Sequence, residues 1–177
     1  MDWDAIGAIG EILGAAAVII SIVYLASQVR ESNRAARNAA ETEYQVRWNA
    51  MCDHMWNSNE SANRTRRGYH DLALLTPDER TVFFNQLGKM VDVQRIGMRM
   101  HEKGLLADDL YEAGNNAVAF IMKTAGARDW WQTSRDFYIH RDFIEELMAR
   151  DHGPISENPF FSFDPEAEVT DSEGGLT

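Results

Sequence analysis

The sequence predicts an all-α protein in which one N-terminal transmembrane helix continues into a cytoplasmic helical bundle. An apolar run of 22 residues, from Ala5 to Ala26, contains a single charged residue, and a helix of about 20 such residues crosses a bilayer core. Apolar residues then recur at spacings of three and four between residues 77 and 150, which is typical of amphipathic helices. No stretch alternates apolar and polar residues in the way that a half-buried strand does.

Length and composition exclude several classes of function. A chain of 177 residues corresponds to one domain with appendages. The single cysteine, Cys52, excludes an internal disulfide framework and a multi-cysteine metal site. The formal net charge is −11, whereas nucleic acids are bound mainly through Lys and Arg. DNA and RNA are therefore not expected as partners.

The apolar run is expected to stay in the mature protein as a membrane anchor. A cleaved signal peptide has a basic start, but residues 1–4 contain two aspartates and no Lys or Arg, and Leu25-Ala26-Ser27 is a poor cleavage site. Basic residues follow the run and none precedes it, which predicts an outside N-terminus and a cytoplasmic C-terminal part. These residues are Arg30, Arg34 and Arg37.

Small and polar residues form a stripe along the predicted span, which we call the seam. The opposite stripe, with Ile12 and Ile20, has the apolar character that lipid favours, whereas small residues let helix backbones approach each other. The seam therefore predicts a helix–helix interface. Its members in and near the span are Gly7, Glu11, Gly14, Val18, Ser21, Leu25 and Gln28.

The seam continues beyond the membrane with the same spacing. No Pro or Gly interrupts residues 15–56, so one helix is expected to leave the bilayer and run on as an extension over residues 29–56. A sustained period of 3.5 residues favours a left-handed coiled coil of several copies. Two alternatives remain: the seam packs against a different membrane protein, or its cytoplasmic part folds onto the chain's own helices. The cytoplasmic seam comprises Ser32, Ala35, Ala39, Thr42 and Val46.

Glu11 is the ionisable group inside the span. In an oligomer it would form a ring of carboxylates, with Ser21 and Gln28 as further polar rings, and such rings line many cation pathways. The alternative is that Glu11 extends toward the outer headgroups, where the dipole at the helix N-terminus favours a negative charge.

The cytoplasmic bundle is expected to occupy residues 57–153. Residues 57–63 are predicted to be a polar loop, followed by a short helix over 64–74. The strongest local signal is Thr76-Pro77-Asp78-Glu79, a capping box that starts a helix at Pro77 and carries it to about Glu102, with Gly104 as a terminator. Further helices are predicted over 108–123, with Gly126 beyond its end, and over 134–150.

Residues 154–177 are expected to form an acidic, largely disordered tail. They contain six acidic residues and no Lys or Arg, and so supply −6 of the net charge of −11. The segment Pro159-Phe160-Phe161-Ser162-Phe163 is the exception. Its three aromatic residues are expected to dock on the chain's own bundle or on a neighbouring subunit.

Catalytic and metal-binding patterns are missing from the sequence. None of the five histidines has the spacing of a zinc or di-iron motif, and no phosphate-binding glycine loop occurs. We therefore expect neither an enzyme nor a resident cofactor or metal. The densest basic group, Arg64, Arg66 and Arg67, is a candidate contact for an anion or a lipid headgroup, although three arginines are fewer than lipid-binding clusters usually contain.

The opening residues resemble a group of short uncharacterised bacterial membrane-anchored proteins. The matching stretches are Trp3 to Gly14, Ser21 to Ala26 and Gln28 to Arg30. The resemblance implies a bacterial inner-membrane protein with one span and a helical cytoplasmic part, and it transfers no site residues. Two functions follow as hypotheses: a homo-oligomer forming a channel-like pore or a membrane scaffold, or an accessory subunit docked on a larger membrane complex. A membrane-tethered ligand sensor or enzyme is a third, with no supporting constellation.

Overall fold

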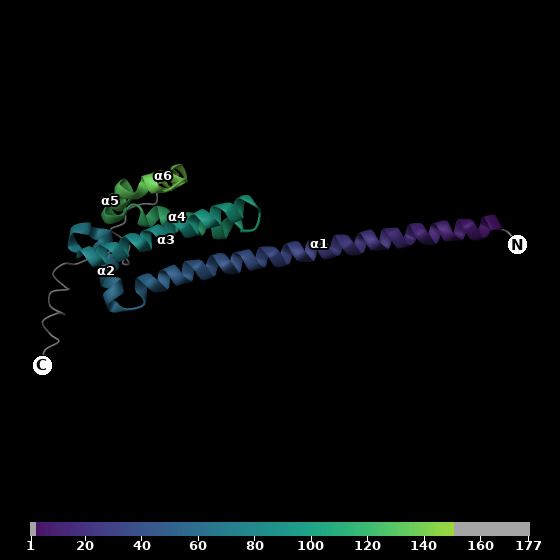
Figure 1. Ribbon diagram of the computed structural model, residues 1–177, viewed down its shortest axis with the longest axis horizontal. Helices are drawn as coiled ribbons and strands as arrows, with labels where there is room; N and C mark the ends of the chain where they lie inside the picture. Colours follow the sequence, from purple (N-terminus) through teal and green to yellow (C-terminus); the bar gives the residue numbers. More distant parts are fainter. Residues whose placement is uncertain (1–2, 151–177) are drawn as a thin grey trace, which may run out of the picture.

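The computed structural model describes residues 3–150, apart from the side chains of residues 4–9, and contains helices without strands in this range. One long helix dominates the molecule: α1 runs from Trp3 to Trp56 without a break, over 54 residues, or about 81 Å at 1.5 Å per residue. Its N-terminal part stands clear of the remaining helices, which gather beside its C-terminal part (Figure 1). The predicted continuous extension of the span as a helix is confirmed.

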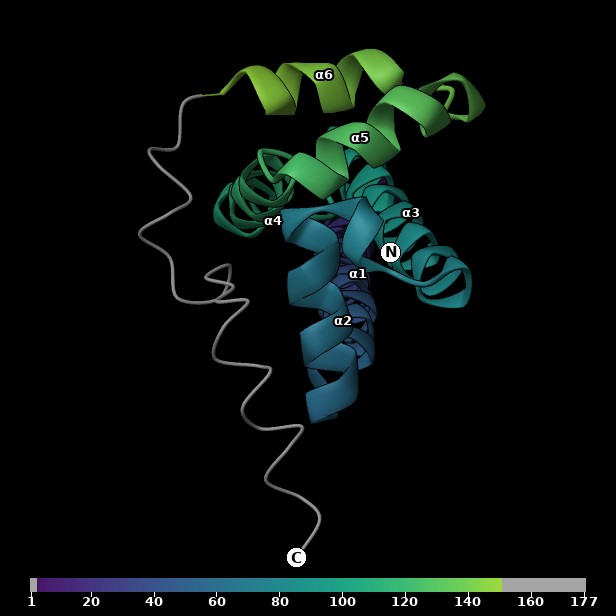
Figure 2. The ribbon, with the colours of Figure 1, turned by 90° about the vertical axis from the view of Figure 1, so that its left-hand side faces the viewer.

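Within residues 3–150, five further α-helices form the bundle beside the end of α1. Two short 3-10 helices lie among them, η1 (Leu72–Leu74) and η2 (Arg135–Phe137). Viewed along the molecule, α6 lies on one side of α4, and α1 with α2 lies on the other (Figure 2). The α-helices are α2 (Asn59–His70), α3 (Pro77–Glu102), α4 (Asp108–Ile121), α5 (Ala125–Ser134) and α6 (Arg141–Ala149).

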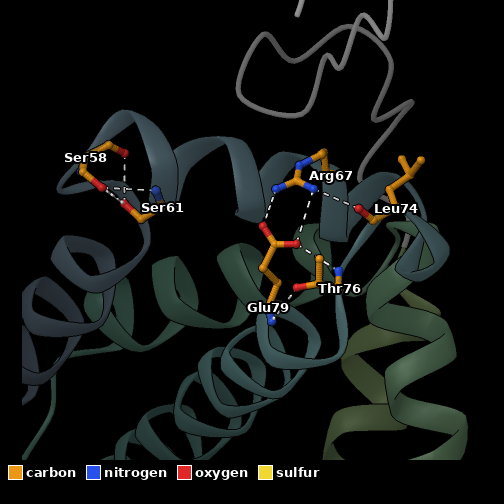
Figure 3. Close-up of polar contacts among 6 residues, drawn as sticks. All are labelled: Ser58, Ser61, Arg67, Leu74, Thr76 and Glu79. Carbon is orange, nitrogen blue, oxygen red and sulfur yellow. Dashed lines mark hydrogen bonds and ion pairs between the residues drawn. The ribbon is translucent and has the colours of Figure 1, made fainter. Parts of the chain in front are cut away.

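The sequence predicted α3 to its bounds. Thr76 caps the helix, since its side chain accepts a hydrogen bond from the Glu79 N–H, and Glu79 accepts one from the Thr76 N–H in return (Figure 3). Gly104 follows the helix with a φ of 65°, the left-handed conformation that glycine adopts without strain. The residue types at both ends of α3 therefore fix its limits locally.

The predicted polar loop over residues 57–63 is wrong for most of its length. α2 already begins at Asn59, because Ser58 and Ser61 form a reciprocal capping box that satisfies N–H groups of the first turn (Figure 3). Serine at the third helical position replaces the usual Glu or Gln, so the sequence pattern at this helix start is weak.

The predicted helix over 134–150 is also wrong in its first half. A separate helix, α5, occupies residues 125–134, and α6 begins only at Arg141. Gly126 is predicted to lie beyond a helix end, yet it lies in the first turn of α5, which Thr124 caps. A Cβ atom at Gly126 would lie 1.7 Å from the Gly68 carbonyl oxygen, so close packing of α5 on α2 requires this glycine.

The core lies between α1, α3, α4 and the helices around them. Phe83, Leu87 and Met90 of α3 are almost fully buried, as are Trp131 of α5 and Leu147 of α6. α1 contributes Met51 and Met55, while Trp48 and Trp56 pack at the edge of this core. Trp130, beside Trp131 in α5, is buried in the same core.

Candidate functional site

The exposed length of α1 is the first candidate site. Every described side chain from Gly10 to Ala39 is exposed, although this stretch includes the most apolar residues of the chain. Within the described residues α1 is the one helix long and apolar enough to cross a membrane, and its apolar stretch has no cover from the rest of the protein. The protein therefore carries a candidate membrane-anchoring helix near its N-terminus.

The seam lies along this uncovered stretch. Glu11, Gly14, Val18, Leu25 and the other seam residues described at side-chain level are exposed, and Gly7 lies within α1. Two polar members of the seam make hydrogen bonds within their own helix: the Ser21 hydroxyl donates to the Ala17 carbonyl at 2.8 Å, and Gln28 Nε2 donates to the Tyr24 hydroxyl at 3.0 Å.

The glycines of the span differ from the glycines of the bundle. A Cβ atom added at Gly10 or Gly14 would meet nothing within 4 Å. In contrast, a Cβ atom at Gly68, Gly97 or Gly114 would lie within 3 Å of another side chain. Glycine inside a helix costs about 1 kcal/mol of stability relative to alanine. In the bundle, close contacts within the chain require glycine, whereas no contact within the chain requires it at Gly10 or Gly14.

The second candidate site is the junction where α1 meets the bundle. Tyr44 of α1 is 1% exposed, and its hydroxyl donates to Gln94 Oε1 of α3 at 2.7 Å. Gln94 Nε2 then donates to Asn115 Oδ1 of α4 at 2.6 Å. Burial raises the pKa of Tyr44, so the hydroxyl stays protonated and remains a donor. One buried hydrogen-bonded chain thus connects three helices.

The series of hydrogen bonds continues to Arg150, the last described residue. Asn115 Nδ2 donates to Glu112 Oε1 at 3.2 Å, and Arg150 pairs with Glu112 Oε2 at 2.7 Å. The hydrogen bond from Arg150 is the main cause that lowers the pKa of Glu112. The contacts connect the long helix to the residue that follows α6, and therefore fix the direction of α1 relative to the bundle.

Sequence reasoning missed this junction. Tyr44, Gln94 and Asn115 belong to no recognised motif, but Gly97 and Gly114 were a usable signal, since each lies inside a helix where glycine is unfavourable. The Tyr44 ring occupies the space that these two glycines leave, and a Cβ atom added at Gly97 would lie 2.6 Å from its Cε2 atom.

The predicted anion or lipid contact is partly engaged in internal pairs. Arg67 pairs with Glu79 at 2.5 Å and donates to the Leu74 carbonyl at 2.9 Å (Figure 3). Arg66 donates to Asn63, and the Nε atom of Arg64 is buried without a hydrogen-bond partner among the described residues. The three side chains lie on one helix, but an external anion would compete with Glu79 for Arg67.

Metal binding finds no support in the described part of the chain. Residues 3–150 contain no group of three His, Cys, Asp or Glu side chains placed to hold an ion. His101 instead stacks on Tyr111, with ring centroids 4.2 Å apart, and contacts Asp108 at 2.8 Å.

Comparisons with protein-family models, curated proteins and solved structures found no match to this chain. The chain is therefore assigned to no family, and its function has to be argued from the two sites described above.

Proposed function

We propose that this is a homo-oligomeric single-span protein of the bacterial inner membrane, with its N-terminus outside and its bundle in the cytoplasm. In this proposal the α1 helices of several copies meet along the seam and hold the bundles around them as a membrane scaffold. Arg30, Arg34 and Arg37 at the inner end of the span support the orientation.

The observation that carries the proposal is the position of the seam on α1. Successive residues of an α-helix are rotated by about 100°. On this basis the buried face with Tyr44, Met51 and Met55 lies roughly opposite the cytoplasmic seam. Thr42 is exposed, and Val46 is 60% exposed. The chain's own bundle therefore leaves the seam uncovered, which argues against the alternative that the seam folds onto its own helices.

The span adds a second line of support. Gly10 and Gly14 have open space around them, and small residues of this kind let a second helix backbone approach closely in lipid. The Ser21 hydroxyl and the Gln28 side-chain N–H group each donate within their own helix, so these two donors need no water in a packed interface. That arrangement favours a packed scaffold over a water-filled path.

Cysteine crosslinking tests the proposed interface. In a Cys52→Ser background, we expect Gly14→Cys and Ser21→Cys to give strong dimer bands in membranes upon oxidation. The matched controls Ile12→Cys and Ile20→Cys lie at similar depths on the lipid-facing side, so they should crosslink weakly. The reverse pattern would overturn the proposed seam.

The mass of the detergent-solubilised particle separates the scaffold from the accessory subunit. A homo-oligomer has a protein mass that is a whole multiple of the chain mass, whereas an accessory subunit purifies with a different protein or as a monomer. Conductance is tested separately by bilayer recordings of the wild type against Glu11→Ala. A current that depends on Glu11 would identify the oligomer as a pore lined by this carboxylate.

A further inference from the structure

An apolar groove runs between α1 and α4, beside the buried face of α1, and Tyr44, Met51 and Met55 of that face contribute to its lining. Its larger part has a volume of about 420 Å³, and its smaller part, about 250 Å³, shares Trp48 and Ala117 with it. The larger part is lined almost entirely by apolar and aromatic side chains, principally Trp48, Cys52, Trp56, Tyr69, Phe120 and Ile121. We call the two parts together the α1–α4 groove.

One polar group of the groove, the Trp48 indole, has no hydrogen bond of good geometry among the described residues. Its N–H is buried, and the Tyr44 ring packs edge-on against the indole at 6.3 Å. A buried donor without an acceptor is unfavourable.

We propose that the α1–α4 groove binds the aromatic segment Pro159–Phe163 of the same chain. This segment lies outside the described residues, and it combines three phenylalanines within four positions. A phenylalanine side chain buries about 150 Å² or more when it enters a core. A groove of this volume and composition matches such side chains better than it matches the acidic residues on either side of them.

The point where the described chain ends places the segment within reach. Arg150 is held at Glu112, near the end of the groove that Leu110 and Ala113 line. Phe160 follows ten residues later, which corresponds to at most about 35 Å of extended chain. The α4 lining from Leu110 to Ile121 covers only about 17 Å at 1.5 Å per residue, so the segment reaches the whole groove.

The charges of the tail and of α2 favour a segment that enters the groove beside Glu112 and runs toward α2. The far end of the groove includes Tyr69 of α2, and α2 carries three arginines against one glutamate. The residues that follow the phenylalanines include Asp164, Glu166 and Glu168 and contain no Lys or Arg. A segment that enters beside Glu112 therefore brings its apolar part to the groove and its acidic part to the basic helix.

Cys52 provides a native probe of the occupied groove. It is the single cysteine of the chain, it lines the groove, and residues 3–150 leave its side chain exposed. A bound tail would cover it. We therefore expect a maleimide to label Cys52 of the full-length protein in mild detergent about tenfold more slowly than it labels the variant Phe160→Ala/Phe161→Ala/Phe163→Ala.

The control is Phe137→Ala, which removes a phenylalanine that is 86% exposed on the bundle surface and should leave the labelling rate unchanged. Equal rates in the wild type and the triple variant, with equal helicity by circular dichroism, would overturn the proposal. A wild-type rate that rises upon dilution would also overturn it, because it would identify a second copy as the cover.

A disulfide supplies a direct measurement. Ser162→Cys, oxidised at low protein concentration, should form an intramolecular bond with Cys52 that changes the mobility of the monomer. Dimer bands alone, or no bond, would contradict binding within the chain. The proposal does not depend on self-association through the seam, so crosslinking at Gly14 and Ser21 and labelling at Cys52 succeed or fail independently.

Discussion

Tyr44 is the residue on which the attachment of the long helix depends most. Its ring fills the space beside Gly97 and Gly114, and its hydroxyl starts the hydrogen-bonded chain through Gln94 and Asn115. A buried polar chain of this kind stabilises one arrangement when every member is satisfied and is costly when one member is lost.

Gly114→Ala tests this fit. The new Cβ atom would lie 2.1 Å from the Tyr44 hydroxyl oxygen and 2.4 Å from Gln94 Oε1, so the side chains must shift. We expect the free energy of unfolding of the bundle to fall by about 1–3 kcal/mol, measured by chemical denaturation in detergent. In a double-mutant cycle, Tyr44→Phe should recover part of the loss in Gly114→Ala, because it removes the clashing oxygen. Simple additivity would show that the two residues are not coupled.

The second prediction concerns Glu79, whose ionisation is expected to make the stability of the fold depend on pH. Partial burial opposes its ionisation, but hydrogen bonds from Thr76 and Arg67 outweigh that effect and lower the pKa of Glu79. A carboxyl whose folded pKa lies below its unfolded value of about 4.3 stabilises the fold above that value and loses this contribution as the pH falls through the folded pKa. The free energy of unfolding should therefore decrease below about pH 4.5.

The matched variant is Glu79→Gln, which keeps the size of the side chain and cannot ionise. Its free energy of unfolding should be lower at neutral pH and should change less between pH 5 and 3 than that of the wild type. The expected difference at neutral pH is about 1 kcal/mol or less, because the pair is partly exposed to solvent. An identical pH dependence in both proteins would exclude Glu79 as its source.

At the scale of helices, α5 shows how one close contact positions an element. Gly126 touches the backbone of Gly68 in α2, and a backbone carbonyl cannot move aside as a flexible side chain can. Gly126→Ala is therefore expected to displace α5 and to reduce the melting temperature of the bundle by roughly 10 °C or more, the shift that a loss of several kcal/mol produces. Ala125→Ser, one residue earlier and exposed, should cause little change. A neutral Gly126→Ala would mean that α5 and α2 separate without cost.

At the scale of the whole molecule, α1 carries the candidate membrane segment, the linking turns and the bundle contact as one continuous helix. The seam keeps its direction from the apolar stretch to the bundle only while this helix is continuous, because a break would let the bundle rotate. Ala36 lies in the exposed stretch between the span and the first bundle contact at Ala40.

Ala36→Pro tests that continuity. Proline removes a helical hydrogen bond and clashes with the preceding turn, so α1 should kink between the span and the bundle. In a Cys52→Ser background, we expect the oxidative crosslink of Val46→Cys to be lost in the proline variant, while that of Ser21→Cys is retained. Ala36→Ser serves as the control and should keep both crosslinks. Retention of the Val46→Cys crosslink beside proline would show that the cytoplasmic seam does not need a continuous α1.

The sequence predicted those features that neighbouring residues decide. The uninterrupted α1, the capping box of α3 and the turn at Gly104 depend on side chains within a few positions of one another, and all three are confirmed. The start of α2 at Asn59 and the separate α5 were missed, because serine caps are weak signals and Gly126 resembles a helix terminator in sequence. The interface role of the seam stays a prediction, since the rest of the described chain leaves the seam residues exposed.

The sequence by itself determined that the protein is helical, that one helix is apolar enough to cross a membrane, and which stripe of that helix is small and polar. These properties follow from composition and period, which are local. Only the tertiary structure decided that α1 joins the bundle through Tyr44 and that this leaves the seam uncovered. Gln94, which accepts the hydrogen bond from Tyr44, lies 50 residues away along the chain, and a contact over such a separation depends on how the helices pack together.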